Sequence, residues 1–280
     1  IVYDREGNEI DQYVSTNSNR LSVGMDEIPD YLGKAFVAIE DERFYQHNGI
    51  DFKSIIRAGY QFFKTGGEEA QGASTITQQL LKNTVFTDWT SEGNNKIKKI
   101  KRKIQEQYLA LEITKYYSKD EILLRYMNAI NLGQNTLGVE SASLRYFGKH
   151  CSELTISECA VIASITQNPS KYNPIRHPEE NVKRREKCLN KMLELGFISQ
   201  TQYDEAMADT DAVYERIGLY DIDYQEANAT TGSYFSDAVY EQVKQDLILS
   251  GYNENMAETL LTSGGLRVES TLDPKIQAIL

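Results

Sequence analysis

A short helix that is apolar on every side constrains this fold more than any other feature of the sequence. Thr155 to Glu158 has the Thr-x-x-Glu pattern of a capping box, which starts a helix by satisfying its first backbone N–H groups. The residues that follow, Cys159 to Ile165, are nearly all apolar. A helix without a polar face is buried. The sequence therefore predicts a helical domain built around this segment.

Other helices are predicted on both sides of it, from apolar periodicity and from start and stop signals. They cover about Pro29–Glu42, Asp51–Phe63, Gly72–Asn83, Lys96–Tyr116, Ser118–Asn131, Gly138–Phe147 and Pro178–Gly196.

The two ends of the chain have a different character. Residues 1–21 alternate apolar and polar around Arg5-Glu6-Gly7-Asn8, which predicts a β-hairpin. Near the other end, two helices (233–249 and 253–261) and a strand (265–272) follow an acidic stretch, 205–231, that is typical of a linker. We expect a mainly α fold with a β lead-in at 1–25, a helical domain at 26–200 and a small α/β linker segment at 201–280.

Composition excludes several classes of protein. The net charge of −11 argues against nucleic-acid binding. No run of 18 or more apolar residues is present, so no membrane anchor is expected within this chain. Three cysteines and three widely spaced histidines do not form a zinc pattern.

Two adjacent carboxylates stand at the end of an apolar run in the stretch AFVAIEDERFYQHNG. The run Ala35 to Ile39 leads directly into Glu40 and Asp41. A carboxyl group at the edge of a core can be tuned as an acid or base by desolvation and by nearby charges. The alternative is a solvated helix end, since surface carboxylates are common.

The segment GASTITQQLLKN combines a helix start with polar side chains. Small hydroxylated residues such as Ser74 and Thr75 cap a helix, and they can equally direct N–H and O–H groups at an anion. Lys82 is a single basic residue near the end of the same segment. Both interpretations stay open from the residues alone.

The helix from Lys96 to Tyr116 has two contrasting faces. One is an apolar stripe, Ile97, Ile100, Ile104, Tyr108 and Leu111. The other gathers Lys99, Arg102 and Lys103 around Glu106, which is either a solvated face with an i, i+4 ion pair or a cationic cradle for phosphate. Between this helix and the previous one, residues 84–95 lack periodicity but contain Trp89, and we expect a loop that faces a bilayer.

Five sequence segments, taken in order, resemble the five motifs of the peptidoglycan glycosyltransferases of family 51. They are EDERFYQHNG, GASTITQQLLKN, RKIQE (102–106), KDEILLRYMN (119–128) and RREKCL (184–189). SITQNPSKYNP, 164–174, is similar to the family's link between its last two motifs. The tail GGLRVESTLDPKIQ resembles the segment that joins this domain to a transpeptidase domain in class A penicillin-binding proteins.

The resemblance implies a lysozyme-like, two-lobed glycosyltransferase domain with a membrane-facing jaw. Such a domain polymerises lipid II, using a lipid-linked glycan as donor, into β-1,4-linked strands with inversion and release of undecaprenyl diphosphate. It also implies the bacterial cell membrane, extracytoplasmic face, as the location, with a transpeptidase domain in the full-length protein. No organic cofactor is implied, whereas a divalent cation, Mg²⁺ or Mn²⁺, is an open alternative at Glu106 through the substrate diphosphate.

Carried onto this chain, the family pattern assigns roles to individual residues. Glu40 is the expected general base for the acceptor hydroxyl, and Glu106 assists at the donor diphosphate across the same cleft. Positive charge for the diphosphate is expected from Lys82, Arg102, Lys103, Arg184 and Arg185. Sugar and phosphate oxygens are expected to bind Ser74, Thr75, Thr77, Gln78, Gln79 and Asn83. Asp41, Phe44 and His47 are expected to shape the surroundings of the base, and Tyr126 and Asn128 to support the cleft.

Departures from the family pattern are few. Leu124 and Cys188 replace the usual residues at two positions that read as packing sites.

Because exposed charge pairs contribute little to folding, we expect Lys82→Ala or Arg102→Ala to reduce activity without changing thermal stability. The chain has no Ser-x-x-Lys sequence, so no penicillin-reactive serine is expected here.

Two other functions fit parts of the sequence. A lysozyme-like enzyme that cleaves glycans would share the helices and the glutamate, but it has no need for the cationic residues. A non-catalytic cell-wall scaffold would use the carboxylates in salt bridges. Incubation with lipid II separates all three.

Overall fold

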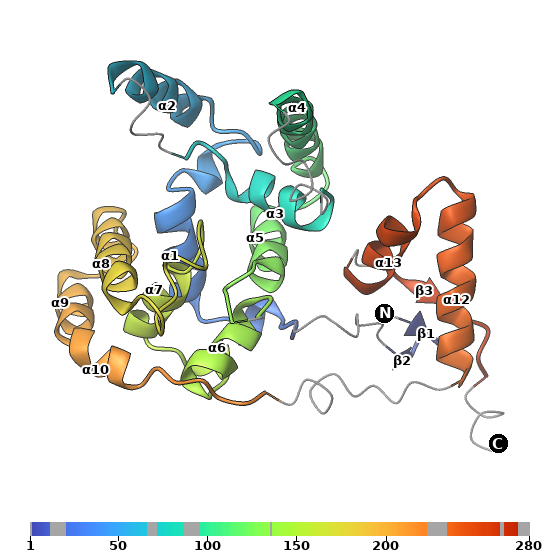
Figure 1. Ribbon diagram of the computed structural model, residues 1–280. Coiled ribbons are helices and arrows are strands. Elements are labelled where there is room, and N and C mark those ends of the chain that lie inside the picture. The colour runs from blue at the N-terminus through green and yellow to red at the C-terminus, as the bar shows by residue number, and fades with distance from the viewer. Residues whose placement is uncertain are drawn as a thin grey trace. The chain divides into compact units, whose positions relative to one another are not determined.

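The computed structural model describes residues 2–11, 21–65, 72–86, 96–134, 136–222, 234–263 and 266–273. The chain divides into two compact units, one of residues 19–222 and one that combines residues 1–18 with 223–280. Figure 1 shows the elements of both. The mainly α fold class predicted from the sequence is confirmed.

The described part of the larger unit consists mainly of helices. Its elements are η1 (Met25–Glu27), α1 (Asp30–Glu40), η2 (Phe44–Gln46), α2 (Phe52–Lys64), α3 (Ile76–Thr84), α4 (Lys96–Ile113), α5 (Lys119–Ala129), α6 (Val139–Phe147), η4 (Cys151–Glu153), α7 (Ile156–Ala163), α8 (Pro178–Glu194), α9 (Gln200–Ala208) and α10 (Thr210–Glu215).

Helix α7 lies at the centre of this unit, as its apolar sequence predicts. The capping box of Thr155 and Glu158 starts it, and seven of its eight residues are buried. Helices α1, α6, α8, α9 and α10 pack around it (Figure 1). Most of the hydrophobic core therefore surrounds α1 and α7.

A second, smaller hydrophobic cluster joins α2, α3 and α4. Ile50, Leu81 and Ala110 form its buried centre. Gly49 has φ +87°, and a Cβ there would lie 2.1 Å from the carbonyl oxygen of Ala110. Only glycine allows the chain to pass α4 so closely. Two separate clusters agree with the expectation of two lobes.

The apolar faces of α2 and α4 point outward. Ile56 on α2 is 72% exposed and Ile100 on α4 is 61% exposed. Phe52, Tyr60, Ile97, Ile104 and Tyr108 are exposed as well. An apolar stripe normally faces the core. In α4 the orientation is reversed, because Glu106 on the polar face is buried. Of the predicted loop 84–95, only Thr84, Val85 and Phe86 are among the described residues; Trp89 is outside them.

Helices α9 and α10 extend the helical unit beyond the predicted boundary at residue 200. Ser199 and Gln202 form a capping box that starts α9. Ala206 and Val213 are buried in the main core. The residues from 201 to 222 thus belong to the helical unit, because they complete the packing around α7 and α8.

The smaller unit joins the two ends of the chain. β1 (Val2–Tyr3) pairs antiparallel with β2 (Glu9–Asp11), which confirms the hairpin, and parallel with β3 (Val268–Glu269). Helices α12 (Tyr234–Leu249) and α13 (Glu254–Ser263) pack against each other in the same unit. The β lead-in and the C-terminal segment, expected as separate parts, therefore form one unit through the pairing of β1 with β3.

Candidate active site

A cleft of about 810 Å³ lies in the larger unit. Its walls come from the end of α1, from α2, from α3 and the residues just before it, from α4 and from α8. Seven basic side chains line it, Arg57, Lys82, Arg102, Lys103, Arg184, Lys187 and Lys191. Among the residues that the structure describes, four acidic side chains do so, Glu40, Asp41, Glu42 and Asp51. The cleft is thus locally basic in a chain whose net charge is −11.

Glu40 is the last residue of α1, and its side chain is only 8% exposed. Nε2 of Gln79 donates a hydrogen bond to Oε2 at 2.8 Å. Nη2 of Arg184 donates to Oε1 at 2.6 Å, and the hydroxyl of Thr166 contacts the same oxygen. The carboxylate is therefore held by groups from three separate segments.

Arg184 is itself held in place beside Glu40. Its guanidinium lies over the ring of Tyr172, 4.8 Å from the centroid, and its Nη1 donates to Oε1 of Gln167 at 2.7 Å. Gln167 has φ +66°, a conformation that non-glycine residues rarely adopt. Such strain is common at functional sites, and here it belongs to the turn that orients the arginine.

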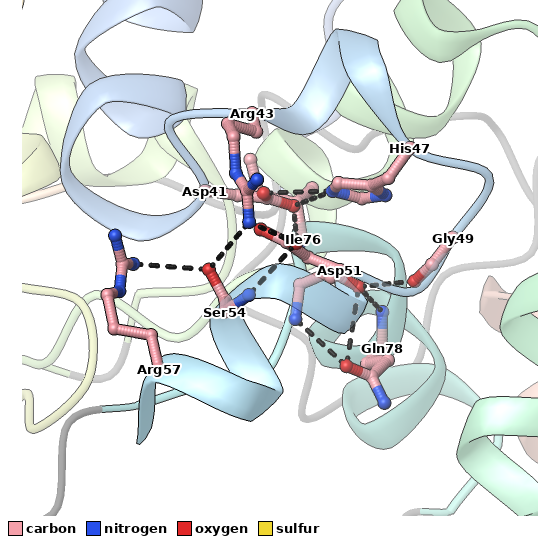
Figure 2. A network of polar contacts seen from close by, with 10 residues as sticks. Asp41, Arg43, His47, Gly49, Asp51, Ser54, Arg57, Ile76 and Gln78 are labelled. Atoms are coloured by element: carbon pink, nitrogen blue, oxygen red, sulfur yellow. Dashed lines mark hydrogen bonds and ion pairs between the residues drawn. The ribbon is translucent and has the colours of Figure 1, made fainter. Parts of the chain in front are cut away.

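Asp41 links the first and second motifs. Both of its carboxylate oxygens lie near Nε2 of His47, at 2.9 and 3.0 Å, and Oδ2 accepts the backbone N–H of Ile76 at 3.0 Å (Figure 2). A carboxylate only accepts hydrogen bonds, so Nε2 of His47 must carry the proton. This arrangement ties the end of α1 to the first residue of α3.

A second set of contacts connects the chain around α2 and α3 (Figure 2). Arg43 forms an ion pair with Asp51, the N-cap of α2, whose carboxylate also accepts from Ser54. Burial raises the pKa of Asp51, but the hydrogen bonds from Ser54 and the charge of Arg43 outweigh it and lower the pKa to about 2. Thr75 donates to the carbonyl of Gly49 at 2.6 Å. Polar contacts therefore hold the starts of α2 and α3 in place.

Glu106 is completely buried on the inner face of α4. Arg102 pairs with its Oε1, and Nζ of Lys103 lies 2.7 Å from its Oε2. Arg102 and Lys103 line the cleft, whereas Glu106 lies behind them. The expectation that Glu106 faces Glu40 directly across the cleft is therefore wrong in this structure. Its carboxylate instead positions two cations that do face the cleft.

The surroundings of Glu106 do not fit a divalent cation. Mg²⁺ and Mn²⁺ prefer several oxygen ligands, and both oxygens of Glu106 already accept from positively charged groups. No group of three or more His, Cys, Asp or Glu side chains that could hold a metal occurs among the described residues. We therefore assign no metal to Glu106.

Most of the residues predicted for the site line the same cleft. These are Glu40, Asp41, Ser74, Thr75, Gln78, Gln79, Lys82, Asn83, Arg102, Lys103 and Arg184. Thr75 and Gln78 also form the capping box of α3, which confirms the capping interpretation; binding of an anion by this segment stays a prediction. Phe44, His47 and Thr77 lie behind the wall. Phe44 and Thr77 are completely buried.

Arg185 does not belong to the cleft. Its side chain is fully buried and donates to the hydroxyls of Ser157 and Thr210 and to the carbonyl of Ala206. Burial lowers its pKa. Adjacent residues of a helix point about 100° apart, so Arg184 and Arg185 cannot face the same side. The prediction that Arg185 binds the diphosphate is wrong.

Several residues of the site were missed from the sequence. Thr166 and Gln167 contact Glu40 and Arg184, but an uncharged turn between two helices gave no chemical signal, even though the segment 164–174 resembles the family. Arg57 and Lys191 were missed as well. Both pair with Glu42, at 3.0 and 3.4 Å, and lie on otherwise ordinary helical faces.

The transglycosylase family model matches residues 6–193 of the 280-residue chain. The chain belongs to this family. It is 40% identical to penicillin-binding protein 1A of Clostridium perfringens over 286 residues, and 39% identical to that of Clostridium acetobutylicum. It is 37% identical to penicillin-binding protein 1F of Bacillus subtilis over 276 residues.

These three alignments cover 99% of the chain but only 33 to 35% of each relative. The chain thus spans about a third of the length of the relatives it matches. Among solved structures, it matches penicillin-binding protein 1A of Haemophilus influenzae with a TM-score of 0.43 and 23% identity, over 99% of this chain and 27% of that one.

Proposed function

We propose that this chain is a peptidoglycan glycosyltransferase that polymerises lipid II. One observation carries the proposal. The side chain of Glu40, at the end of α1, lies at a cleft whose described lining carries more basic than acidic side chains. Glycosyl transfer from a lipid diphosphate needs a base for the acceptor and positive charge for the leaving group. Cleavage of a neutral glycosidic bond needs an acid to protonate its sugar leaving group, not a group of cations, so the basic side chains of the cleft disfavour a glycan-cleaving enzyme.

In this mechanism Glu40 removes the proton from the 4-hydroxyl of the acceptor sugar. The hydroxyl oxygen attacks C1 of the donor, and the bond from C1 to the diphosphate oxygen breaks as the new β-1,4 bond forms. The electron pair leaves with undecaprenyl diphosphate. Lys82, Arg102 and Lys103 stabilise its charge, because cationic donors to phosphate oxygens form strong hydrogen bonds. Attack from the side opposite the leaving group inverts C1.

The outward apolar faces of α2 and α4 support a location at a membrane surface. Exposed apolar patches commonly mark binding surfaces, and a lipid-linked substrate must be reached at the bilayer. None of the helices that the structure describes combines the length and the hydrophobicity that a membrane span requires. We propose that the domain works on the extracytoplasmic face of the bacterial membrane and that a transpeptidase domain follows it in the full-length protein.

The test is incubation with lipid II, scored for glycan polymer. Glu40→Gln keeps the shape of the side chain and removes the base, so we expect no polymer while lipid II still binds. Glu42→Gln is the matched control, because Glu42 lines the same cleft but pairs only with Arg57 and Lys191 among the described residues. Polymer formation by Glu40→Gln at the wild-type rate would exclude Glu40 as the base.

A further inference from the structure

A line of hydrogen bonds runs from the core to the back of Glu40. The hydroxyl of Tyr126 lies 3.1 Å from Oε1 of Gln79, and Nε2 of the same amide lies 2.8 Å from Oε2 of Glu40. The three residues come from α5, α3 and α1. Tyr126 therefore reaches the carboxylate of Glu40 through one amide group.

The direction of each hydrogen bond follows from chemistry. An ionised carboxylate only accepts, so Gln79 must turn its NH₂ group toward Glu40. Its carbonyl oxygen then points to Tyr126, and the phenol must donate to it. Turning the amide over would place an oxygen against the carboxylate and an NH₂ group against the phenol.

Tyr126 is rigidly placed for this task. Its side chain is completely buried, and its ring packs edge-on against Phe36 on α1, with centroids 5.7 Å apart. Phe36 and Glu40 are four residues apart on the same helix, so they lie on one face. Burial, followed by the nearby charge of Glu40, raises the pKa of Tyr126 well above its usual value of 10. The phenol therefore keeps its proton across the physiological range.

We propose that Tyr126 is a positioning residue for the reaction, which holds the amide of Gln79 in the orientation that donates to Glu40. This inference rests on the proposed role of Glu40 as the base. The hydrogen bond from Tyr126 to Gln79 keeps the NH₂ group of Gln79 as a donor to Oε2 of Glu40, while Arg184 and Thr166 contact Oε1. We call this arrangement of Tyr126 and Gln79 the lock. Without the phenol hydroxyl, Oε1 of Gln79 loses its donor and the amide is free to turn over.

Tyr126→Phe tests this with little change in shape. We expect kcat to fall about tenfold, the order of one lost hydrogen bond in a buried network, with KM changed less than about twofold. The acidic limb of the pH profile of kcat/KM should move to higher pH. A hydrogen-bond donor to a carboxylate favours its charged form, and Tyr126→Phe weakens the donor from Gln79 to Glu40. Tyr146→Phe is the matched control. Tyr146 is also fully buried, but its hydroxyl donates to the carbonyl of Leu132, at 2.8 Å.

A double substitution distinguishes an effect of Tyr126 through Gln79 from a general effect on the core. Gln79→Met has a similar length but cannot bridge Tyr126 and Glu40. In that background, Tyr126→Phe should lower kcat no further. An equal loss of kcat with and without Gln79 would overturn the proposal, because Tyr126 would then act by another route.

A readout that needs no catalysis comes from the side-chain amide of Gln79 in ¹⁵N NMR spectra, assigned by its loss in Gln79→Met. We expect the amide protons to exchange slowly with solvent in the wild-type chain and faster in Tyr126→Phe, with no change in Tyr146→Phe. Unchanged exchange in Tyr126→Phe would overturn the lock. Absence of polymer from the wild-type chain would instead refute the proposed function, and the NMR result would still decide on the lock.

Discussion

Arg102→Ala is expected to destabilise the protein as well as inactivate it. The side chain of Arg102 is only 12% exposed, and it pairs with Glu106, which is fully buried. Lys103, the other partner of Glu106, is 43% exposed. The sequence alone predicts an exposed pair with little influence on stability, and the burial of Glu106 changes that expectation.

The magnitude follows from the burial of Glu106. Removing one partner of a buried ion pair costs about 3–5 kcal/mol when the other charge is left uncompensated. Lys103 still contacts Oε2 at 2.7 Å, so we expect a smaller loss, about 2–3 kcal/mol, which is typical of a hydrogen bond to a charged group. At about 2–4 °C per kcal/mol for a domain of this size, Tm should fall by about 4–12 °C.

Thermal unfolding followed by circular dichroism measures this change. Glu106→Gln in the Arg102→Ala background should recover much of the lost stability, because it removes the buried charge. Lys99→Ala is the control on the same helix, since Lys99 is exposed, and it should change stability by less than about 0.5 kcal/mol. If Arg102→Ala unfolds within about 1 °C of the wild-type protein, the pair does not stabilise α4 and the reasoning fails.

Two further predictions concern other parts of the larger unit. The hydrogen bond from His150 to Glu140, at 2.6 Å, raises the pKa of His150 above 6.5; the pair therefore stabilises the fold fully below about pH 6.5 and loses its effect as the pH rises through the folded pKa. His150→Gln should lower Tm more at pH 6 than at pH 9, by a small amount because His150 is 71% exposed, and equal losses at both values would contradict this assignment. Ile56→Glu and Ile100→Glu should each weaken binding to phospholipid vesicles and leave Tm nearly unchanged, because both side chains are already exposed; vesicle binding equal to wild type would show that these faces do not meet a bilayer.

Local sequence patterns were sufficient to predict most helices and the residues that start them. The capping boxes at Thr155 and Ser118 begin α7 and α5 as predicted. Capping depends on contacts within one turn, so it can be deduced without tertiary structure. The apolar composition of α7 was equally informative, since a helix with no polar face has to be buried. The order of the five motifs likewise indicated the family before any fold was known.

Only the tertiary structure decided which side of each helix meets the protein. Periodicity places Ile100 and Glu106 on opposite faces of α4, but it does not say that the isoleucine is exposed and the glutamate buried. It also could not separate Arg184, which pairs with Glu40, from Arg185, which is buried behind the cleft. The physical reason is that a face becomes a core only through the elements packed against it, and these come from distant parts of the chain. Thr166, 126 residues from Glu40, joined the site in the same way.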